Sequence, residues 1–159
     1  MSQSDFEKTR EDFIETIGMI VQADGFPRIS GRMFGLLVFD GGAHAFGDLA
    51  RALQVSRGSI SSSARLLEEQ GLIRRVSKPG QRQDYFEVAE NPYQTLLKRF
   101  AQRAETSRER IAGFAQVVCA ENPEICQRLQ DYAQFFDTIR QCTETACDRL
   151  NSLKEQENA

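Results

Sequence analysis

The middle of the chain has the feature that most restricts its fold: a short helix, a tight turn, a capped helix and a hairpin follow in direct succession. Residues 46–53 place three apolar side chains on one helical face. After a two-residue turn, Ser56 is a typical N-cap, so a further helix is predicted from there to Gln70. Val55 and Ile60 stand at the two positions of a hydrophobic staple. This order predicts a helix-turn-helix.

A β-hairpin is predicted next. Two short runs of extended type, about 72–77 and 84–88, are separated by a polar loop. Pro79 and Gly80 fit the central positions of a type II turn, because proline fixes the first φ and glycine accepts the positive second φ. A hairpin of this kind after a helix-turn-helix is the wing of a winged helix.

Two helices are predicted before this region. The first is amphipathic and fills most of residues 1–25, and the second covers residues 29–39. Gly31 and Gly35 lie four apart, on one face of the second helix. Because neither carries a Cβ atom, we expect another helix to cross closely there.

Two long helices are predicted after the hairpin. Asn91-Pro92 and Asn122-Pro123 each place an N-cap residue before proline at the first helical position. Apolar residues step by three and four along both helices, as in a heptad seam, so each helix is expected to pack along its length. The alternatives are a dimerisation layer and an intramolecular three-helix bundle with the first helix.

The charge of the chain is unevenly distributed. The net charge of −3 is unfavourable for binding nucleic acid. Residues 57–83, however, hold six basic and two acidic residues, a net charge of +4, which leaves −7 for the rest of the chain. A concentrated basic segment favours DNA as the partner more than a weakly basic average would.

Three segments resemble a known family. Residues 55–76, VSRGSISSSARLLEEQGLIRRV, and residues 78–86, KPGQRQDYF, look like the GbsR-like branch of the MarR superfamily, and residues 31–37, GRMFGLL, resemble its second helix. The resemblance covers residues 28–90. It implies a winged-helix dimer that binds a pseudo-palindromic operator, usually as a repressor, and it suggests a small-molecule effector. Ala45 and Gln81 depart from the residues common in the family at these positions.

The candidate DNA-binding residues come from the capped helix and the wing. A serine-rich first turn offers small donors at a helix N-terminus, where phosphate binds well, and Arg57 and Arg65 can reach guanine or phosphate. Arg82 suits the minor groove, with Asp84 placed to orient it. The alternative is an ordinary solvated surface. The predicted DNA-binding residues are Ser56, Arg57, Ser59, Ser61, Ser62, Arg65, Arg74, Arg75, Lys78 and Arg82.

The sequence thus predicts a mainly α protein with a small β-wing, in three regions. Residues 1–25 form an N-terminal dimerisation helix, residues 26–90 the winged helix-turn-helix, and residues 91–159 a helical dimerisation region. We expect a homodimeric transcriptional regulator, because one helix and one wing give a small monomeric interface with DNA. The alternative function is a helical protein-interaction or redox-sensing module.

Other residues give weaker indications. A quaternary ammonium compound is one kind of effector that the resemblance suggests, and binding such a cation requires several aromatic rings that surround it. Most of the aromatic residues that could form such a cage are expected to belong to the hydrophobic core instead. These candidates are Phe26, Phe34, Phe39, Phe46, Phe114, Tyr132, Phe135 and Phe136. Cys126, Cys142 and Cys147 are expected to pack as small apolar side chains, without zinc, while redox activity of these residues or of Cys119 stays open.

Enzymatic activity and membrane association are not expected. There is no cofactor motif, and His44 near Asp40 and Asp48 is more simply a loop residue than part of a catalytic dyad. The N-terminal segment does not have the pattern of a secretory signal, and the longest apolar run, residues 36–39, is too short to span a bilayer. We therefore expect a cytoplasmic protein.

Overall fold

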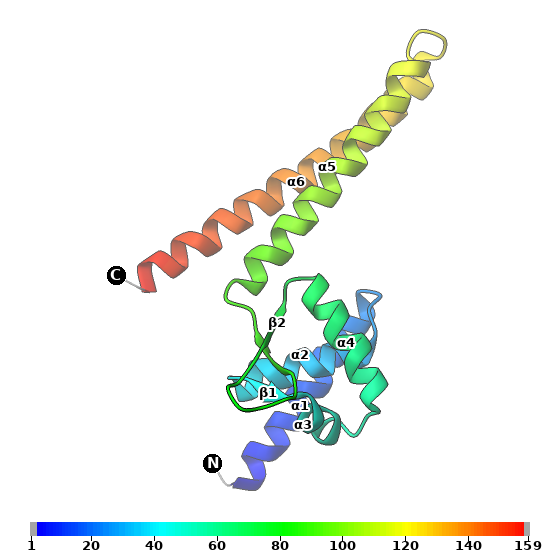
Figure 1. Cartoon of the computed structure of the whole chain (residues 1–159). Helices are drawn as coiled ribbons and strands as arrows, with labels where there is room; N and C mark the ends of the chain where they lie inside the picture. The colour runs from blue at the N-terminus through cyan, green and yellow to red at the C-terminus, as the bar shows by residue number, and fades with distance from the viewer. Residues whose placement is uncertain (1–2, 158–159) are drawn as a thin grey trace. The chain divides into compact units, whose positions relative to one another are not determined.

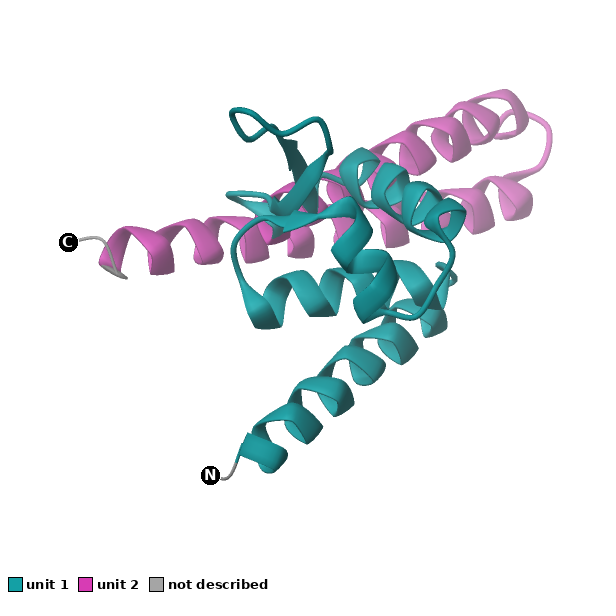
Figure 2. Ribbon diagram, turned by 60° about the horizontal axis from the view of Figure 1, so that its bottom comes forward, with its two compact units in different colours: residues 1–92 teal, residues 93–159 magenta. Residues whose placement is uncertain are grey.

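The computed structural model describes residues 3–157 and is mainly helical, with one small antiparallel sheet (Figure 1). The elements in chain order are α1 (Gln3–Ala23), α2 (Arg28–Asp40), β1 (His44–Ala45), α3 (Phe46–Ala52), α4 (Arg57–Glu69), β2 (Ile73–Val76), β3 (Tyr85–Val88), α5 (Pro92–Val118) and α6 (Pro123–Glu157). They form two compact units, Met1–Pro92 and Tyr93–Ala159 (Figure 2). The predicted fold class, mainly α with a small β-wing, is confirmed.

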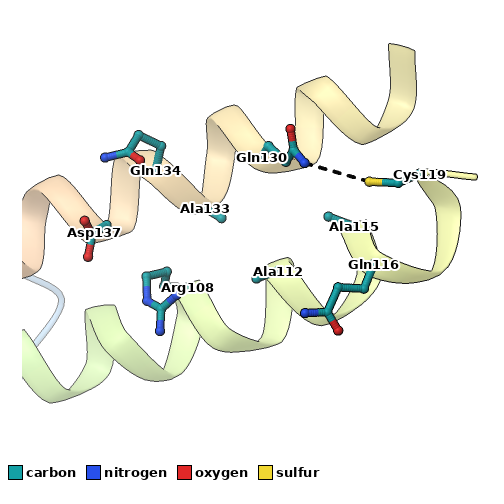
Figure 3. Close-up of a pocket in the computed structure, with 9 residues that line it drawn as sticks. All are labelled: Arg108, Ala112, Ala115, Gln116, Cys119, Gln130, Ala133, Gln134 and Asp137. Carbon is teal, nitrogen blue, oxygen red and sulfur yellow. Dashed lines mark hydrogen bonds between the residues drawn. The ribbon is translucent and has the colours of Figure 1, made fainter. Parts of the chain in front are cut away.

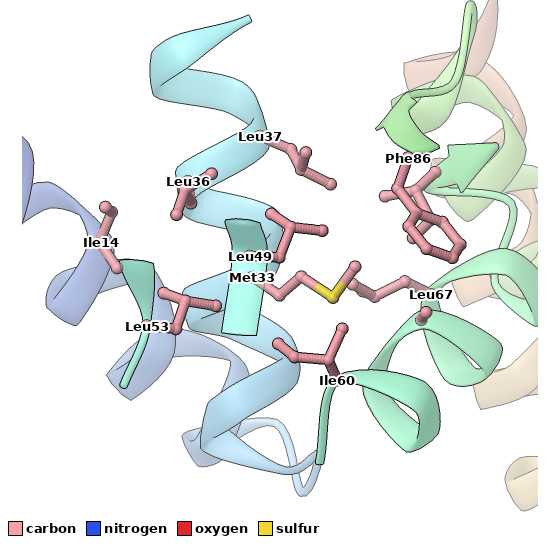
Figure 4. Close-up of a cluster of buried hydrophobic side chains, with 11 residues drawn as sticks. Ile14, Met33, Leu36, Leu37, Leu49, Leu53, Ile60, Leu67 and Phe86 are labelled. Atoms are coloured by element: carbon pink, nitrogen blue, oxygen red, sulfur yellow. The ribbon is translucent and has the colours of Figure 1, made fainter. Parts of the chain in front are cut away.

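Unit 1 is built around a core of large apolar side chains (Figure 4). α2, α3, α4 and β3 contribute its most deeply buried members. These are Met33, Leu36, Leu37, Leu49, Leu53, Ile60 and Phe86, each at most 1% exposed. Burying one side chain of this size away from water stabilises the folded state by about 1.5–3 kcal/mol. This core fixes the position of α4, which carries half of the predicted DNA-binding residues.

α1 crosses α2 at the predicted glycines. A Cβ atom on Gly31 would lie 2.7 Å from the Ile17 carbonyl oxygen and 2.9 Å from the Gly18 Cα, and one on Gly35 would lie 3.1 Å from the Ile17 Cβ. The expectation of a close helix crossing is therefore confirmed. An ion pair of 2.7 Å between Arg28 and Glu15 also joins the two helices.

The sheet contains one strand that the sequence did not predict. Its order is β1-β3-β2, with both pairs antiparallel. β1 is only two residues long, His44 and Ala45, opposite Phe86 and Tyr85 of β3. Two residues are too few to show an alternating pattern, because the period of a strand is itself two.

Unit 2 is a hairpin of two antiparallel helices, α5 and α6 (Figure 1). Asn122 caps α6 as predicted, since its side-chain oxygen accepts a hydrogen bond of 3.0 Å from the Ile125 N–H. The described residues of this unit that are buried are Gln94 and small side chains only. The small ones are Ala101, Ala104, Ala115, Cys126, Ala133 and Cys147. The hairpin therefore lacks a core of large side chains of its own.

Two of the four cysteines form a disulfide. Cys119 is bonded to Cys126, whereas Cys142 is free and exposed and Cys147 is free and buried. Cys126 and Cys147 are buried, as expected of small apolar side chains, although Cys126 is bonded and not free. The same expectation was wrong for Cys142, because its position on α6 leaves it exposed. The sequence did predict a new helix from Asn122-Pro123, between the two cysteines, but the cysteine spacing itself has no motif that indicated a bond across this turn.

None of the helices in residues 3–157 combines the length and apolarity that a bilayer crossing requires. The same residues contain no group of three or more histidine, cysteine or carboxylate side chains placed to hold a metal ion.

Candidate nucleic-acid interface

The turn between α3 and α4 sets the start of α4. The Val55 N–H donates to the Ala50 carbonyl at 3.1 Å, and Gln54 adopts a φ of 54°, a left-handed conformation that is uncommon outside glycine. Ser56 then caps α4, because its hydroxyl accepts a hydrogen bond of 3.1 Å from the Ser59 N–H. The predicted cap is confirmed, and the tight turn aims the first turn of α4 outward.

The two faces of α4 differ sharply. Ile60, Ala64 and Leu67 are at most 3% exposed and belong to the unit 1 core. The opposite face is exposed and polar, with Arg57, Ser61, Ser62 and Arg65. Because these residues recur at helical spacing, they form one strip along the helix.

Serine side chains on α4 have different roles. Ser63 is only 4% exposed, and it accepts a hydrogen bond of 3.2 Å from the Ser30 hydroxyl on α2. Ser56 and Ser59 are also linked through their hydroxyl oxygens, 2.9 Å apart, within the cap. Ser61 and Ser62 thus offer the most accessible hydroxyls of the serine-rich segment.

An open hollow lies beside the first turn of α4. It has a volume of about 470 Å³ and is lined from the starts of both α2 and α4. The lining residues are Pro27, Ile29, Ser30, Ser56, Gly58, Ser59, Ser62 and Ser63. The positive ends of two helix dipoles and several hydroxyls meet at this hollow, which suits an anionic group such as a phosphate.

The wing is an ordered β-hairpin. Its loop turns at Pro79 and Gly80 as predicted, with a φ of 76° at Gly80 and a hydrogen bond of 3.1 Å from the Gln81 N–H to the Lys78 carbonyl. Tyr85, which no sequence motif singled out, organises the loop. Its ring lies 4.4 Å from the Lys78 ammonium nitrogen, and its hydroxyl donates to the Gln81 side chain.

The predicted basic residues fall into two groups. Arg74 is paired with Glu87 at 2.6 Å, and Arg75 with both Glu68 and Asp84 at 3.1 Å. The hydrogen bond to Glu68 raises the pKa of Arg75. The expectation that Asp84 orients Arg82 was therefore wrong, because this carboxylate is engaged by the guanidinium of Arg75.

The second group faces solvent. Arg65 and Arg82 are exposed and make no ion pair with any residue in the described part of the chain. The guanidinium of Arg57 lies 5.0 Å from the Phe46 ring centroid, a contact that orients it without neutralising its charge. With Lys78, these residues place four uncompensated cations on α4 and the wing.

The aromatic rings considered for an effector cage are distributed among separate clusters. Phe39 packs near Phe6 and Phe13, whereas Phe46 packs near Phe86. A third group lies on α6, where the Tyr132, Phe135 and Phe136 centroids are 5.2–6.3 Å apart. His44 contacts the Gly41 carbonyl at 2.8 Å, and Asp40 is paired with Arg10 at 2.5 Å, so neither supports the dyad that was considered.

Comparison with known proteins agrees with this geometry. Residues 24–84 match the model of the MarR family. Over 107 residues the chain is 34% identical to the HTH-type transcriptional regulator MmpR5 of Mycobacterium tuberculosis, which covers 67% of this chain and 59% of that protein. Over 152 residues it is 24% identical to the HTH-type transcriptional repressor OpcR of Bacillus subtilis, and this match covers 94% of this chain and 77% of OpcR.

The chain spans only part of some of these relatives. It covers 59% of the length of MmpR5 and 54% of the putative HTH-type transcriptional regulator YvaV of Bacillus subtilis. A solved structure described as a transcriptional regulator superposes with a TM-score of 0.77 at 23% identity, over 91% of this chain and 99% of that one. The fold and the exposed strip define a winged-helix protein. Over residues 24–84 that winged helix is similar to the MarR family.

Proposed function

We propose that the chain is a sequence-specific transcriptional regulator of the GbsR-like branch, which binds duplex DNA as a homodimer and acts as a repressor. One observation carries the proposal: the face of α4 opposite the core is a strip of exposed serine and arginine side chains, next to a wing with uncompensated cations. The names of the relatives point to the same activity. Control by a small-molecule effector is included on the strength of the resemblance alone.

The exposed strip supplies the base contacts in this proposal. In helix-turn-helix proteins the recognition helix enters the major groove with its N-terminal residues at the base edges. Arg57 and Arg65 have the geometry to pair with guanine, and Ser61 and Ser62 are donors or acceptors of short reach. Phosphate contacts come from Lys78, from the hollow beside α4 and from Arg74 and Arg75 once their carboxylate partners are displaced.

Arg82 has a separate role at the tip of the wing. It is exposed and unpaired within the described residues. The negative potential of a narrow minor groove attracts an arginine in this position. We therefore propose that Arg82 enters the minor groove beside the half-site that α4 contacts.

The homodimer is supported by the surface of unit 2. Its small buried residues leave the large apolar side chains outside, with Phe114 68%, Val117 78%, Tyr132 53% and Phe135 53% exposed. Exposed apolar surface of this extent is typical of an interaction site. We propose that a second copy of the chain covers it, with residues 1–25 and 91–159 as the dimerisation regions and residues 26–90 as the DNA-binding region.

The salt dependence of binding tests this proposal. The probe is a duplex selected by the full chain from fragments of its native genome. Removing one cation that neutralises a phosphate lowers the log–log slope against salt by about 0.9. Arg82→Ala is expected to weaken binding and to reduce the slope by about this amount, whereas Arg110→Ala, which removes an exposed charge of α5, leaves both unchanged. Equal slopes for the parent and Arg82→Ala would contradict the assignment, and binding without any salt dependence would contradict the DNA-binding function.

A further inference from the structure

The disulfide of unit 2 lies outside the winged helix, and the proposed function does not use it. Cys119 follows the last residue of α5 and Cys126 belongs to the first turn of α6, so the bond closes the turn of the hairpin. The two Cα atoms are 4.7 Å apart. The covalent link therefore stands at the one point where α5 and α6 are also joined by the chain.

Few other interactions hold the two helices together near this turn. Ala115 on α5 and Ala133 on α6 are the buried residues closest in sequence to the two cysteines. The ion pairs that join the helices lie further along, where Arg140 of α6 contacts Glu105 of α5 at 3.3 Å. Alanine side chains bury little apolar area, so near the turn the disulfide adds a covalent link to the hydrogen bonds that the Val118 carbonyl and the Asn122 side chain accept within the turn itself.

The disulfide is accessible from one side. Cys119 is partly exposed and lines an open groove of about 430 Å³ between α5 and α6, shown in Figure 3. Gln130 lies across this groove, and its amide nitrogen is 3.8 Å from the Cys119 sulfur. Cys126, by contrast, is only 8% exposed. An external thiolate therefore reaches the sulfur of Cys119 more readily than that of Cys126.

We propose that Cys119 and Cys126 form a reversible thiol–disulfide site that controls the shape of the hairpin and, through it, dimerisation and DNA binding. The reductant is a dithiol. One of its thiolates attacks the Cys119 sulfur, the S–S bond breaks, and the Cys126 sulfur leaves with the electron pair and takes up a proton. The second thiol then attacks the mixed disulfide, which releases Cys119 as a thiol and the reductant as its disulfide. The reverse exchange restores the bond.

The consequence follows from the apolar side chains next to the turn. Phe114 and Val117 precede Cys119 by five and two residues, and Tyr132 follows Cys126 by six. All three are more than half exposed. Breaking the bond frees the turn and changes how these side chains are presented to a second copy. The effect on DNA binding rests on the proposed function, because it assumes that dimerisation positions the two winged helices.

The test compares oxidised and reduced full-length protein. Samples are equilibrated with mixtures of dithiothreitol and its oxidised form and then alkylated, and mass spectrometry counts the free thiols. Hydrogen exchange is followed over residues 112–134. We expect a reversible gain of two thiols, faster exchange confined to this segment, a weaker dimer by light scattering, and affinity for the selected duplex lower by about fivefold or more. The double variant Cys119→Ala with Cys126→Ala should behave like the reduced protein in both buffers.

Cys142→Ser is the matched control, because Cys142 is exposed but lies outside the pair. It should keep the full response to reduction. A Cys119–Cys126 pair that resists reduction in the folded protein, or equal dimerisation in both redox states, would overturn the proposal. Equal DNA affinity in both states would overturn its regulatory part and leave the proposed function standing. Loss of DNA binding in both states, with a redox-dependent dimer, would support the thiol–disulfide site and contradict the proposed function.

Discussion

The two units of the chain are both helical, but they bury different kinds of side chain. Unit 1 encloses leucine, isoleucine, methionine and phenylalanine at 0–4% exposure, whereas the described part of unit 2 buries alanine, cysteine and one glutamine. A closed core gives unit 1 a fixed surface, and α4 uses it to present polar side chains in a defined geometry. The hairpin instead leaves its large side chains exposed, as expected for half of an interface. In the proposed function, the unit with the closed core supplies the DNA contacts and the hairpin supplies the contacts between copies.

The largest expected effect comes from opening the unit 1 core. Leu49 is fully buried, so Leu49→Ala should lower the free energy of unfolding by about 2–5 kcal/mol, through reduced burial and the cavity left behind. Leu153 on α6 is 50% exposed, so Leu153→Ala should cost far less in the monomer and act mainly on dimer dissociation. Denaturant unfolding at several protein concentrations separates the two effects. Equal and concentration-independent losses would mean that unit 2 has a core of its own.

The glycines of the two units offer the next comparison. Gly31→Ala would place a Cβ 2.7 Å from a backbone oxygen of α1, so it should destabilise the protein by about 1–3 kcal/mol. Gly113 of α5 has no atom within 4 Å of the position of such a Cβ, and Gly113→Ala should stabilise the helix by up to about 1 kcal/mol. Thermal unfolding of both variants measures the difference. A neutral Gly31→Ala would rule out the close crossing of α1 and α2.

Two neighbouring serines of α4 separate stability from recognition. Ser63→Ala leaves the buried hydroxyl of Ser30 without its partner and should cost about 1 kcal/mol of stability. Ser61→Ala changes an exposed residue, so its stability should match that of the parent while its affinity for the selected duplex falls. Paired measurements of unfolding and DNA binding test this. If the two variants lose the same property, the assignment of the two faces of α4 fails.

The smallest expected effect is on the loss of stability at low pH. The hydrogen bond from Arg28 lowers the pKa of Glu15, where α1 meets α2. A lowered pKa in the folded state stabilises the protein above the ordinary pKa of glutamate, and this contribution is lost as the pH falls through the folded value. Glu15→Gln should therefore flatten the acid limb of the stability–pH curve slightly. If the stability of Glu15→Gln falls with decreasing pH as steeply as that of the parent, the pair of Glu15 and Arg28 contributes nothing to the free energy of unfolding.

Local chemistry explains what the sequence predicted correctly. The cap at Ser56, the turn at Gly80 and the proline-initiated α6 each depend on a few adjacent residues. The close crossing at Gly31 was also predictable, because two missing Cβ atoms on one helical face have few other uses. These features are determined before any distant part of the chain is placed.

Most features that the sequence did not predict depend on distant partners. Ser63 is buried because Ser30 of α2 meets it, and Asp84 faces Arg75 because strand register, not nearness in sequence, decides the pairing. β1 exists only because β3 offers it an edge. The Cys119–Cys126 bond differs from these, because its cysteines are only seven residues apart and flank the helix start that the sequence predicted at Asn122-Pro123. Burial and ion pairing were therefore the least predictable properties of the site.

The most direct test of the central claim is a hydroxyl-radical footprint of the full chain on the duplex it selects. Two winged helices held by one dimer should protect two inverted half-sites whose centres lie about 34 Å apart, one helical turn of DNA. Arg57→Ala should relax base preference equally in both half-sites. A single protected site without symmetry, or protection that is the same on every sequence, would contradict a homodimer that recognises DNA through α4.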